Sequence, residues 1–245
     1  MFTNGHKLIM DMGVDAVAHP LFERHYDELL LGNMREDVYK FPLVERFMLG
    51  KGLTHYYRPG RRGGAFRFVL GAPARADWLF EGAVRRFAHG EARDAFFTLG
   101  RIAHLLSEMV APVHAQVVLH WRGDGFEMLL EREHARLRRL SLPPWPLETR
   151  TAGRLVHALA VECQRFPCDR TRNVPGYVAW RLGLRERPTR ATVESQAAVL
   201  VPLGGAYMAA LFALFLEQVG VAKVAADVTP PRAGATSSCA GRSTG

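Results

Sequence analysis

The sequence predicts an all-α protein built as a single multi-helix domain. Apolar residues recur at helical spacing along most of the chain, and neither a strand-like alternation nor an internal repeat stands out. The 245 residues are 48% hydrophobic and 23% charged, the profile of a folded soluble chain that can bury a large core. We expect one domain over residues 1–227, followed by a low-complexity tail over 228–245 that is disordered.

The expected helices follow from this periodicity and from the turn residues between them. The first is an amphipathic helix over 7–31, followed by a looser stretch over 33–74 that is rich in Gly, Pro and Arg. An irregular stretch precedes the last helix and begins near Pro167. The remaining helices are expected, in chain order, over 75–89, 91–109, 124–140, 149–165 and 189–219.

Part of the last helix has the length and composition of a membrane span. Residues 197–216 carry no charge, and about twenty apolar residues suffice to cross a bilayer. A helix at the centre of a protein core is also apolar all round. The stretch contains Pro202 and two glycines, and we favour the core helix over the membrane anchor.

Charge and cysteine content restrict the partners and the compartment only loosely. A net charge of +8 favours anionic partners such as phosphates, nucleic acid or an acidic membrane surface, but it also serves solubility. Of three cysteines, Cys163 and Cys168 can form one bridge, which leaves Cys239 unpaired. Two aspartates within 7–17 interrupt the only apolar stretch near the start, so no signal peptide is visible.

The chemistry is concentrated in residues 95–115 and the helix that follows. His104 and Glu108 are four residues apart, so they project from one face of a helix and can grip one divalent metal. Such a pair is also common on solvated helix faces, but this one lies among apolar residues, where a charge has to be paired or metal-bound. Pro112 ends the helix and His114 follows it, while Glu127 and Glu131 form a second pair with the same spacing.

The string AFFTLGRIAHLLSEMVAPVHA resembles the core motif of the zinc-dependent phospholipases C and the related fungal zinc nucleases. That motif is Leu-Gly on a helix, then His-x-x-x-Asp, then Pro-x-His. The spacing matches from His104 through Glu108 to His114. Glu108 departs from the family, which usually has Asp as the carboxylate that bridges two metals.

Other family positions follow in the expected order, although each is weaker on its own. Asp37 in GNMREDV resembles the early metal-binding aspartate, and His55 in THYYRP resembles the next ligand. In GDGFEMLLE, Glu127 and Glu131 stand at the late pair, where Glu127 replaces a His. His6 stands at the first family His.

In the family, an N-terminal Trp also binds metal, and Met1 stands five residues before His6 at the spacing of the nuclease branch. Either the true start lies upstream, in a signal peptide, or the site uses Met1 or lacks its third metal. We favour the upstream start.

The resemblance implies two or three Zn²⁺ ions and hydrolysis of phosphodiesters. One ion would be held by Asp37, His55, His104 and Glu108, a second by His114, Glu127 and Glu131, and a third by His6, Glu108 and Met1. Asp37 would also be the catalytic residue that orients or deprotonates water. Family habit suggests a secreted or periplasmic protein, with a cytoplasmic one as the alternative.

The resemblance specifies the substrate less closely than it specifies the type of reaction. The leading expectation is a phospholipase C that acts on glycerophospholipids, with peripheral contact to an anionic membrane. The basic loop Arg58–Arg62 would suit either an anionic lipid surface or nucleic-acid phosphates, although a solvated charge run is the commoner explanation of such a loop. The alternatives are a zinc-dependent single-strand nuclease or nucleotidase and a degenerate, non-catalytic metal-binding member. Val38 stands where choline-specific enzymes have an aromatic residue. Tyr56 and Phe126 are candidate substrate-binding residues.

Overall fold

The computed structural model describes residues 3–36, 55–61, 64, 70–118, 124–146, 148–172 and 174–221. All the regular structure in these residues is helical, which confirms the predicted fold class. The proposed ligands Met1 and Asp37 and the expected tail over 228–245 lie outside the described residues.

Five predicted helices occur close to their expected bounds. They are α5 (Ala72–Ala88), α6 (Ala92–Met109), α8 (Gly125–Leu137), α9 (Ala152–Cys163) and α11 (Arg190–Gln218). The other described elements are α1 (Thr3–Val17), α2 (Pro20–Arg24), α3 (Tyr26–Arg35), α7 (Pro112–Ala115), the 3₁₀ turn η2 (Arg170–Arg172) and α10 (Val174–Arg181).

The prediction of one helix over 7–31 was wrong, because the chain turns twice within this range. Ala18 adopts a left-handed conformation with φ of 47°, which ends α1. His19 is extended, as residues before proline usually are, and Pro20 starts α2. A second break at His25 precedes α3. The apolar pattern continues across both breaks because all three short helices bury one face in the same core.

Two further elements were not expected. Pro112 does end the run of α6, but it also occupies the first turn of α7, where a proline costs no hydrogen bond. The stretch after Pro167, expected to be irregular, contains η2 and α10. Cys163 and Cys168 are free thiols, so the bridge between them is not formed.

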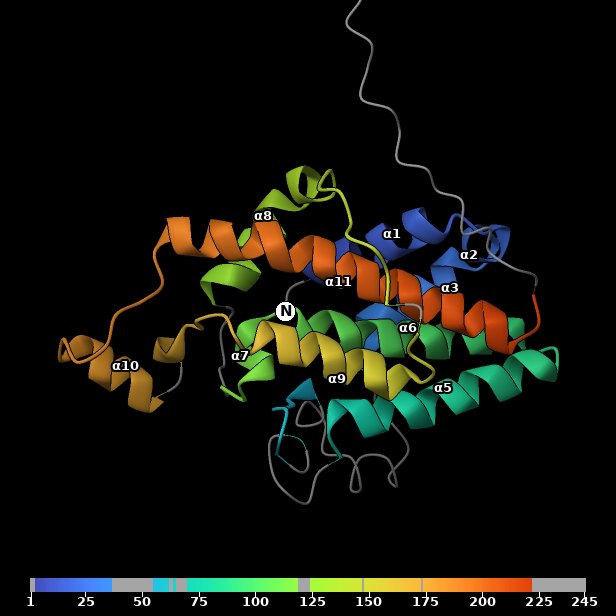
Figure 1. Cartoon of the computed structure of the whole chain (residues 1–245), viewed down its shortest axis with the longest axis horizontal. Coiled ribbons are helices and arrows are strands. Elements are labelled where there is room, and N and C mark those ends of the chain that lie inside the picture. The colour runs from blue at the N-terminus through green and yellow to red at the C-terminus, as the bar shows by residue number, and fades with distance from the viewer. Residues whose placement is uncertain are drawn as a thin grey trace, which may run out of the picture.

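The core is organised around α6, which is buried along most of its length. Helices α1, α3, α5, α9 and α11 all pack against it. The long helix α11 runs lengthwise along the bundle and packs on α1, α8 and α9 (Figure 1). Within the described ranges, α11 alone is long and apolar enough to cross a membrane, yet 78% of its most apolar window is buried. It therefore has the environment of a core helix.

The contact between α3 and α6 is so close that no side chain fits between the two backbones. A Cβ atom at Gly32 would lie 1.9 Å from the carbonyl oxygen of Phe97, and one at Gly100 would lie 2.0 Å from that of Leu29. Gly100 is the glycine of the Leu-Gly pair in the family-like motif. Its small size lets α3 deliver the backbone of Asn33 to the side chain of His104.

We predict that Gly100→Ala lowers the free energy of unfolding by about 1–3 kcal/mol, because one methyl group forces α3 and α6 apart. The matched control is Gly82→Ala in α5. There a Cβ meets only the mobile end of Arg86, and alanine favours the helix by about 0.5–1 kcal/mol. Urea denaturation measures both. Equal stability of the two variants would contradict the close-contact explanation.

Candidate metal centre

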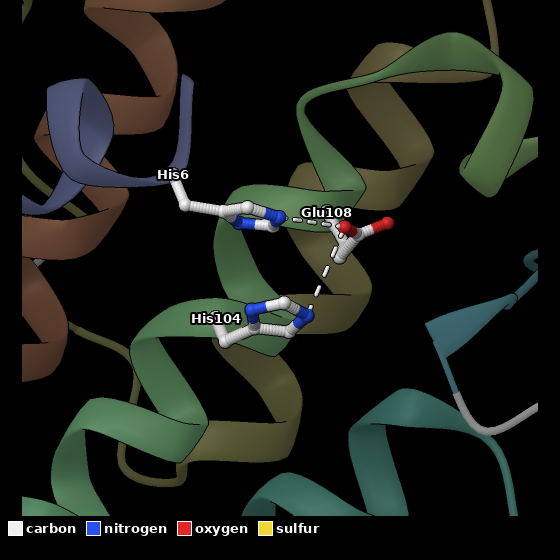
Figure 2. Close-up of side chains that lie close together, drawn as sticks. All are labelled: His6, His104 and Glu108. Atoms are coloured by element: carbon white, nitrogen blue, oxygen red, sulfur yellow. Dashed lines mark ion pairs between the residues drawn. The ribbon is translucent and has the colours of Figure 1, made fainter. Parts of the chain in front are cut away.

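Three ionisable side chains from two helices meet inside the protein. His6 lies in the first turns of α1, while His104 and Glu108 lie one turn apart near the end of α6. Their exposed fractions are 3%, 1% and 1%, and their ligand atoms all lie within 4.8 Å of one another. Figure 2 shows a nitrogen of each imidazole ring directed at the Glu108 carboxylate.

Ser107 determines which nitrogen of His6 carries the proton. The Ser107 hydroxyl donates to the carbonyl oxygen of His104 at 2.8 Å, so it can only accept from His6 Nδ1, which lies 2.5 Å away. His6 therefore carries its proton on Nδ1. The Nε2 atom, which has no hydrogen-bond partner among the described residues, presents its lone pair to Glu108.

A backbone carbonyl has the same effect on His104. His104 Nδ1 lies 2.8 Å from the carbonyl oxygen of Asn33, which can only accept a hydrogen bond. The neutral ring therefore places its lone pair on Nε2, at 3.8 Å from Oε1 of Glu108. The His6 and His104 rings stack with centroids 4.0 Å apart, so both lone pairs approach the same carboxylate oxygen.

The contact between His6 and Glu108 favours a bound cation. His6 Nε2 lies 3.0 Å from Glu108 Oε1, which is an ion pair only if the ring carries a second proton. Burial, reinforced by the neighbouring His104, lowers the pKa of His6 to about 3 despite the opposing effect of Glu108. At neutral pH a lone pair thus faces a carboxylate. A divalent metal would relieve this repulsion and would occupy a buried nitrogen that has no hydrogen-bond partner in the described part of the chain.

The second oxygen of Glu108 faces a different histidine. His114, from α7, places Nδ1 2.6 Å from Glu108 Oε2 and Nε2 3.1 Å from Glu127 Oε1. Burial alone lowers the pKa of His114, but the charge of Glu108 and the hydrogen bonds to both carboxylates outweigh it and raise the pKa to about 9.

The pKa of the Glu108 carboxyl group is lowered, whereas that of His114 is raised. Burial alone raises the carboxyl pKa, but the positive charge of His114 and its close contact hold the pKa well below its usual range. One ionised carboxylate therefore lies between two histidines on one side and a third on the other. This is the arrangement expected of a carboxylate that bridges two metals.

His55 and Tyr56 form one wall of this centre. The His55 ring is buried and meets His104 edge-on, with centroids 4.8 Å apart. Tyr56 stacks on His114 at 4.8 Å, and the backbone N–H of Tyr57 donates to the His114 carbonyl at 3.2 Å. The segment that carries the predicted ligand His55 thus lies directly against the α6–α7 corner.

The two late glutamates have different surroundings. Glu127 completes a capping box with Asp124: each side chain accepts a hydrogen bond from the other residue's backbone, which begins α8. Capping alone accounts for a glutamate there, yet its Oε1 also reaches His114. Glu131 accepts from the backbone and side chain of Asn4, at 2.9 and 3.0 Å, and so ties α8 to α1.

The structure brings most of the predicted ligands together but groups them differently. His6 and His104, which the resemblance assigned to separate ions, lie in one cluster with Glu108. The candidate substrate residues Tyr56 and Phe126 are 9% and 2% exposed, so neither offers an open face for stacking. Phe126 borders a small pocket between α8 and the start of α11.

Sequence reasoning missed Ser107, which contacts this centre, and the buried ion pairs of Glu36. Ser107 lies three residues after His104 and next to Glu108, so its position in an otherwise apolar helix was a usable signal. Glu36 gave no such signal. It is fully buried and paired with Arg75 of α5 and with Arg101 of α6, whose Nε lies 2.7 Å away.

Comparisons with known proteins identify a similar fold but do not assign the chain to a family. No family model matches the sequence, and no curated protein matches it. A solved structure of the alpha-toxin of Clostridium perfringens, from an avian strain, is similar with a TM-score of 0.64 and 13% identity. The alignment covers 89% of this chain and 64% of the toxin chain, so the chain spans less than two thirds of the toxin's length. The chain shares the fold of this matched part of the toxin.

We predict that Ser107→Ala weakens metal binding by about 10–100-fold, because His6 loses the acceptor that fixes its proton on Nδ1. Thr98→Ala is the matched control. Thr98 also lies in α6 and its hydroxyl bonds only to the carbonyl of Asp94, away from the site. Competition with a chromogenic chelator measures both. Equal metal affinity in the two variants would show that Ser107 does not contribute to metal binding.

Zinc binding should also release a proton from His114. With a pKa of about 9, this ring is charged at neutral pH and must lose its proton to bind metal, whereas His6 is already neutral. We expect about one proton released per protein between about pH 7 and 8, falling towards zero as the pH passes His114's pKa. Titration calorimetry in two buffers of different ionisation enthalpy counts it. His114→Asn should lower the release by about one proton per protein near pH 7. An equal release in wild type and variant would contradict this assignment.

Proposed function

We propose that the chain is a zinc-dependent phosphodiesterase, and specifically a phospholipase C that acts on glycerophospholipids. The observation that carries the proposal is the Glu108 carboxylate, which lies between the paired rings of His6 and His104 on one side and His114 on the other. The motif resemblance of residues 95–115 and the fold shared with alpha-toxin support the same assignment.

The donor set fits zinc. The cluster offers imidazole nitrogens and carboxylate oxygens and no thiolate, which suits Zn²⁺ bound in a catalytic rather than a purely structural site. His6, His104 and Glu108 would hold one ion, and His114, Glu127 and Glu108 would hold another. Bound zinc supplies a Lewis acid for the phosphoryl oxygens and an acidified water at neutral pH.

The protein's own groups prepare the site for that chemistry. Ser107 and the Asn33 carbonyl keep the protons of His6 and His104 on Nδ1, which leaves both Nε2 atoms available as donors. The ring of Tyr56 covers one face of His114 and excludes water from it. Asp37 directly follows Glu36, the last described residue of this segment, and its role towards the attacking water stays a prediction.

Fewer observations support a lipid rather than a nucleic acid as the substrate. A single-strand nuclease needs aromatic faces on which bases stack. Tyr56 and Phe126 are both buried, so these two candidates do not provide such a platform. The positive net charge suits either substrate.

We predict that Glu108→Gln lowers hydrolysis of a soluble chromogenic phosphodiester by at least about 100-fold and lowers zinc content, because the amide cannot bridge two cations. The matched control is Glu217→Gln, whose exposed carboxylate only pairs with Arg150. Zinc analysis and turnover before and after chelation measure both. Unchanged hydrolysis in Glu108→Gln would eliminate the proposed site.

The substrate class is tested separately by comparing phospholipids with single-stranded DNA, using zinc-loaded protein. Release of phosphorylated head groups would support the phospholipase, and cleavage of DNA alone would favour the nuclease. Bound zinc without turnover on either substrate would indicate the non-catalytic metal-binding alternative.

A further inference from the structure

The helix α10 and the turn after it stand apart from the bundle. Among the described elements, α10 packs mainly on the short η2 turn, and Figure 1 shows it beyond the end of the bundle where α7 lies. Helices that contribute to the core bury an apolar stripe. This helix instead exposes its apolar side chains.

Four large apolar residues form an exposed surface here, which we call the α10 patch. They are Tyr177, Val178, Leu182 and Leu184, with exposed fractions of 46%, 50%, 68% and 77%. Leu182 and Leu184 are the most exposed large hydrophobic residues in the described part of the chain. Exposed apolar residues that lie together on one projecting element, rather than singly, indicate a surface that binds a membrane or another protein.

The two leucines are held out by an ordered turn. Gly183 has φ of 72°, and the N–H of Leu184 donates to the carbonyl of Ala179 at 2.8 Å, which closes a Schellman cap. In this cap the residue at the position of Leu184 commonly folds back on the helix. Here it remains exposed, so the turn presents Leu182 and Leu184 to the surroundings.

Positive charge surrounds the α10 patch. Three exposed arginines, Arg181, Arg185 and Arg187, are opposed in this segment only by Glu186. The guanidinium of Arg187 lies 3.7 Å from the centre of the Trp180 ring, and its Nε donates to Thr171 at 3.0 Å. Aromatic and aliphatic residues edged by arginines suit the boundary between the acyl chains and anionic head groups of a bilayer.

We propose that the α10 patch docks the protein on an anionic lipid bilayer. The proposal rests on the proposed function for its purpose, since it would bring a phospholipase to its substrate. The α10 region is tied to the metal centre: Arg170 of η2 donates to Gln116 at 2.9 Å, and Gln116 caps the helix that carries His114. Two copies meeting through this patch would bring their arginines together, and four side chains fall short of the roughly 800 Å² per partner of a stable interface.

The test is flotation with vesicles of phosphatidylglycerol and phosphatidylcholine, compared with phosphatidylcholine alone. We expect binding to the anionic vesicles that weakens with added salt. The double variant Leu182→Ser/Leu184→Ser should bind at least about tenfold more weakly, because it loses the inserted apolar surface. Leu31→Ser, an exposed leucine in α3, is the matched control and should bind like the wild type.

The charge contribution has its own pair of variants. Arg181→Glu/Arg185→Glu should lose the preference for anionic vesicles, whereas Arg86→Glu, at an exposed arginine of α5, should keep it. Wild-type protein that fails to float with anionic vesicles, or a leucine double variant that floats equally well, would overturn the proposal. A wild-type dimer that the double variant converts to monomer would also overturn it, by making a second copy the partner.

This experiment is independent of catalysis, because vesicle binding is measured without turnover. Hydrolysis of a soluble phosphodiester should be unchanged in the leucine double variant, which shows that the fold and the site are intact. Loss of vesicle binding with normal soluble turnover would assign the defect to docking. A wild-type protein that binds anionic vesicles but hydrolyses no phosphodiester would contradict the proposed enzymatic function and would still support the docking surface.

Discussion

A charged carboxylate in the middle of the protein is the constraint that the surrounding structure has to meet. Glu108 is 1% exposed on a helix whose neighbours are apolar, and an uncompensated charge there costs several kcal/mol. Compensation comes from imidazoles on three different elements, α1, α6 and α7. The packing of these elements and the chemistry of the site therefore both serve to compensate one buried charge, and a bound metal would compensate it further.

The orientation of two of these imidazoles, His6 and His104, depends in turn on groups outside the cluster. The Ser107 hydroxyl accepts a hydrogen bond from His6 Nδ1, and the Asn33 carbonyl accepts one from His104 Nδ1. The Asn33 carbonyl reaches His104 only because Gly32 and Gly100 let α3 and α6 come into backbone contact. A glycine pair far from any ligand role thus sets the tautomer of a candidate ligand.

Much of the fold was predictable because helices are governed by local rules. Apolar periodicity placed α5, α6, α8, α9 and α11, and Pro167 marked the end of α9. The same rule failed over 7–31, where three short helices share one apolar face and the breaks at Ala18 and His25 leave the pattern undisturbed. Apolar periodicity also failed to predict α10, because the apolar residues of this helix are exposed and do not pack in the core.

The sequence by itself determined the contacts that lie within one helical turn or cap. His104 and Glu108 share a face because helical spacing requires it, and Asp124 and Glu127 form a capping box for the same local reason. Only the tertiary structure decided that His6 meets Ser107, 101 positions away, and that its lone pair therefore faces Glu108. Such a meeting depends on how α1 packs against α6 and α11. That packing is the sum of many weak side-chain contacts, and no single residue spacing records it.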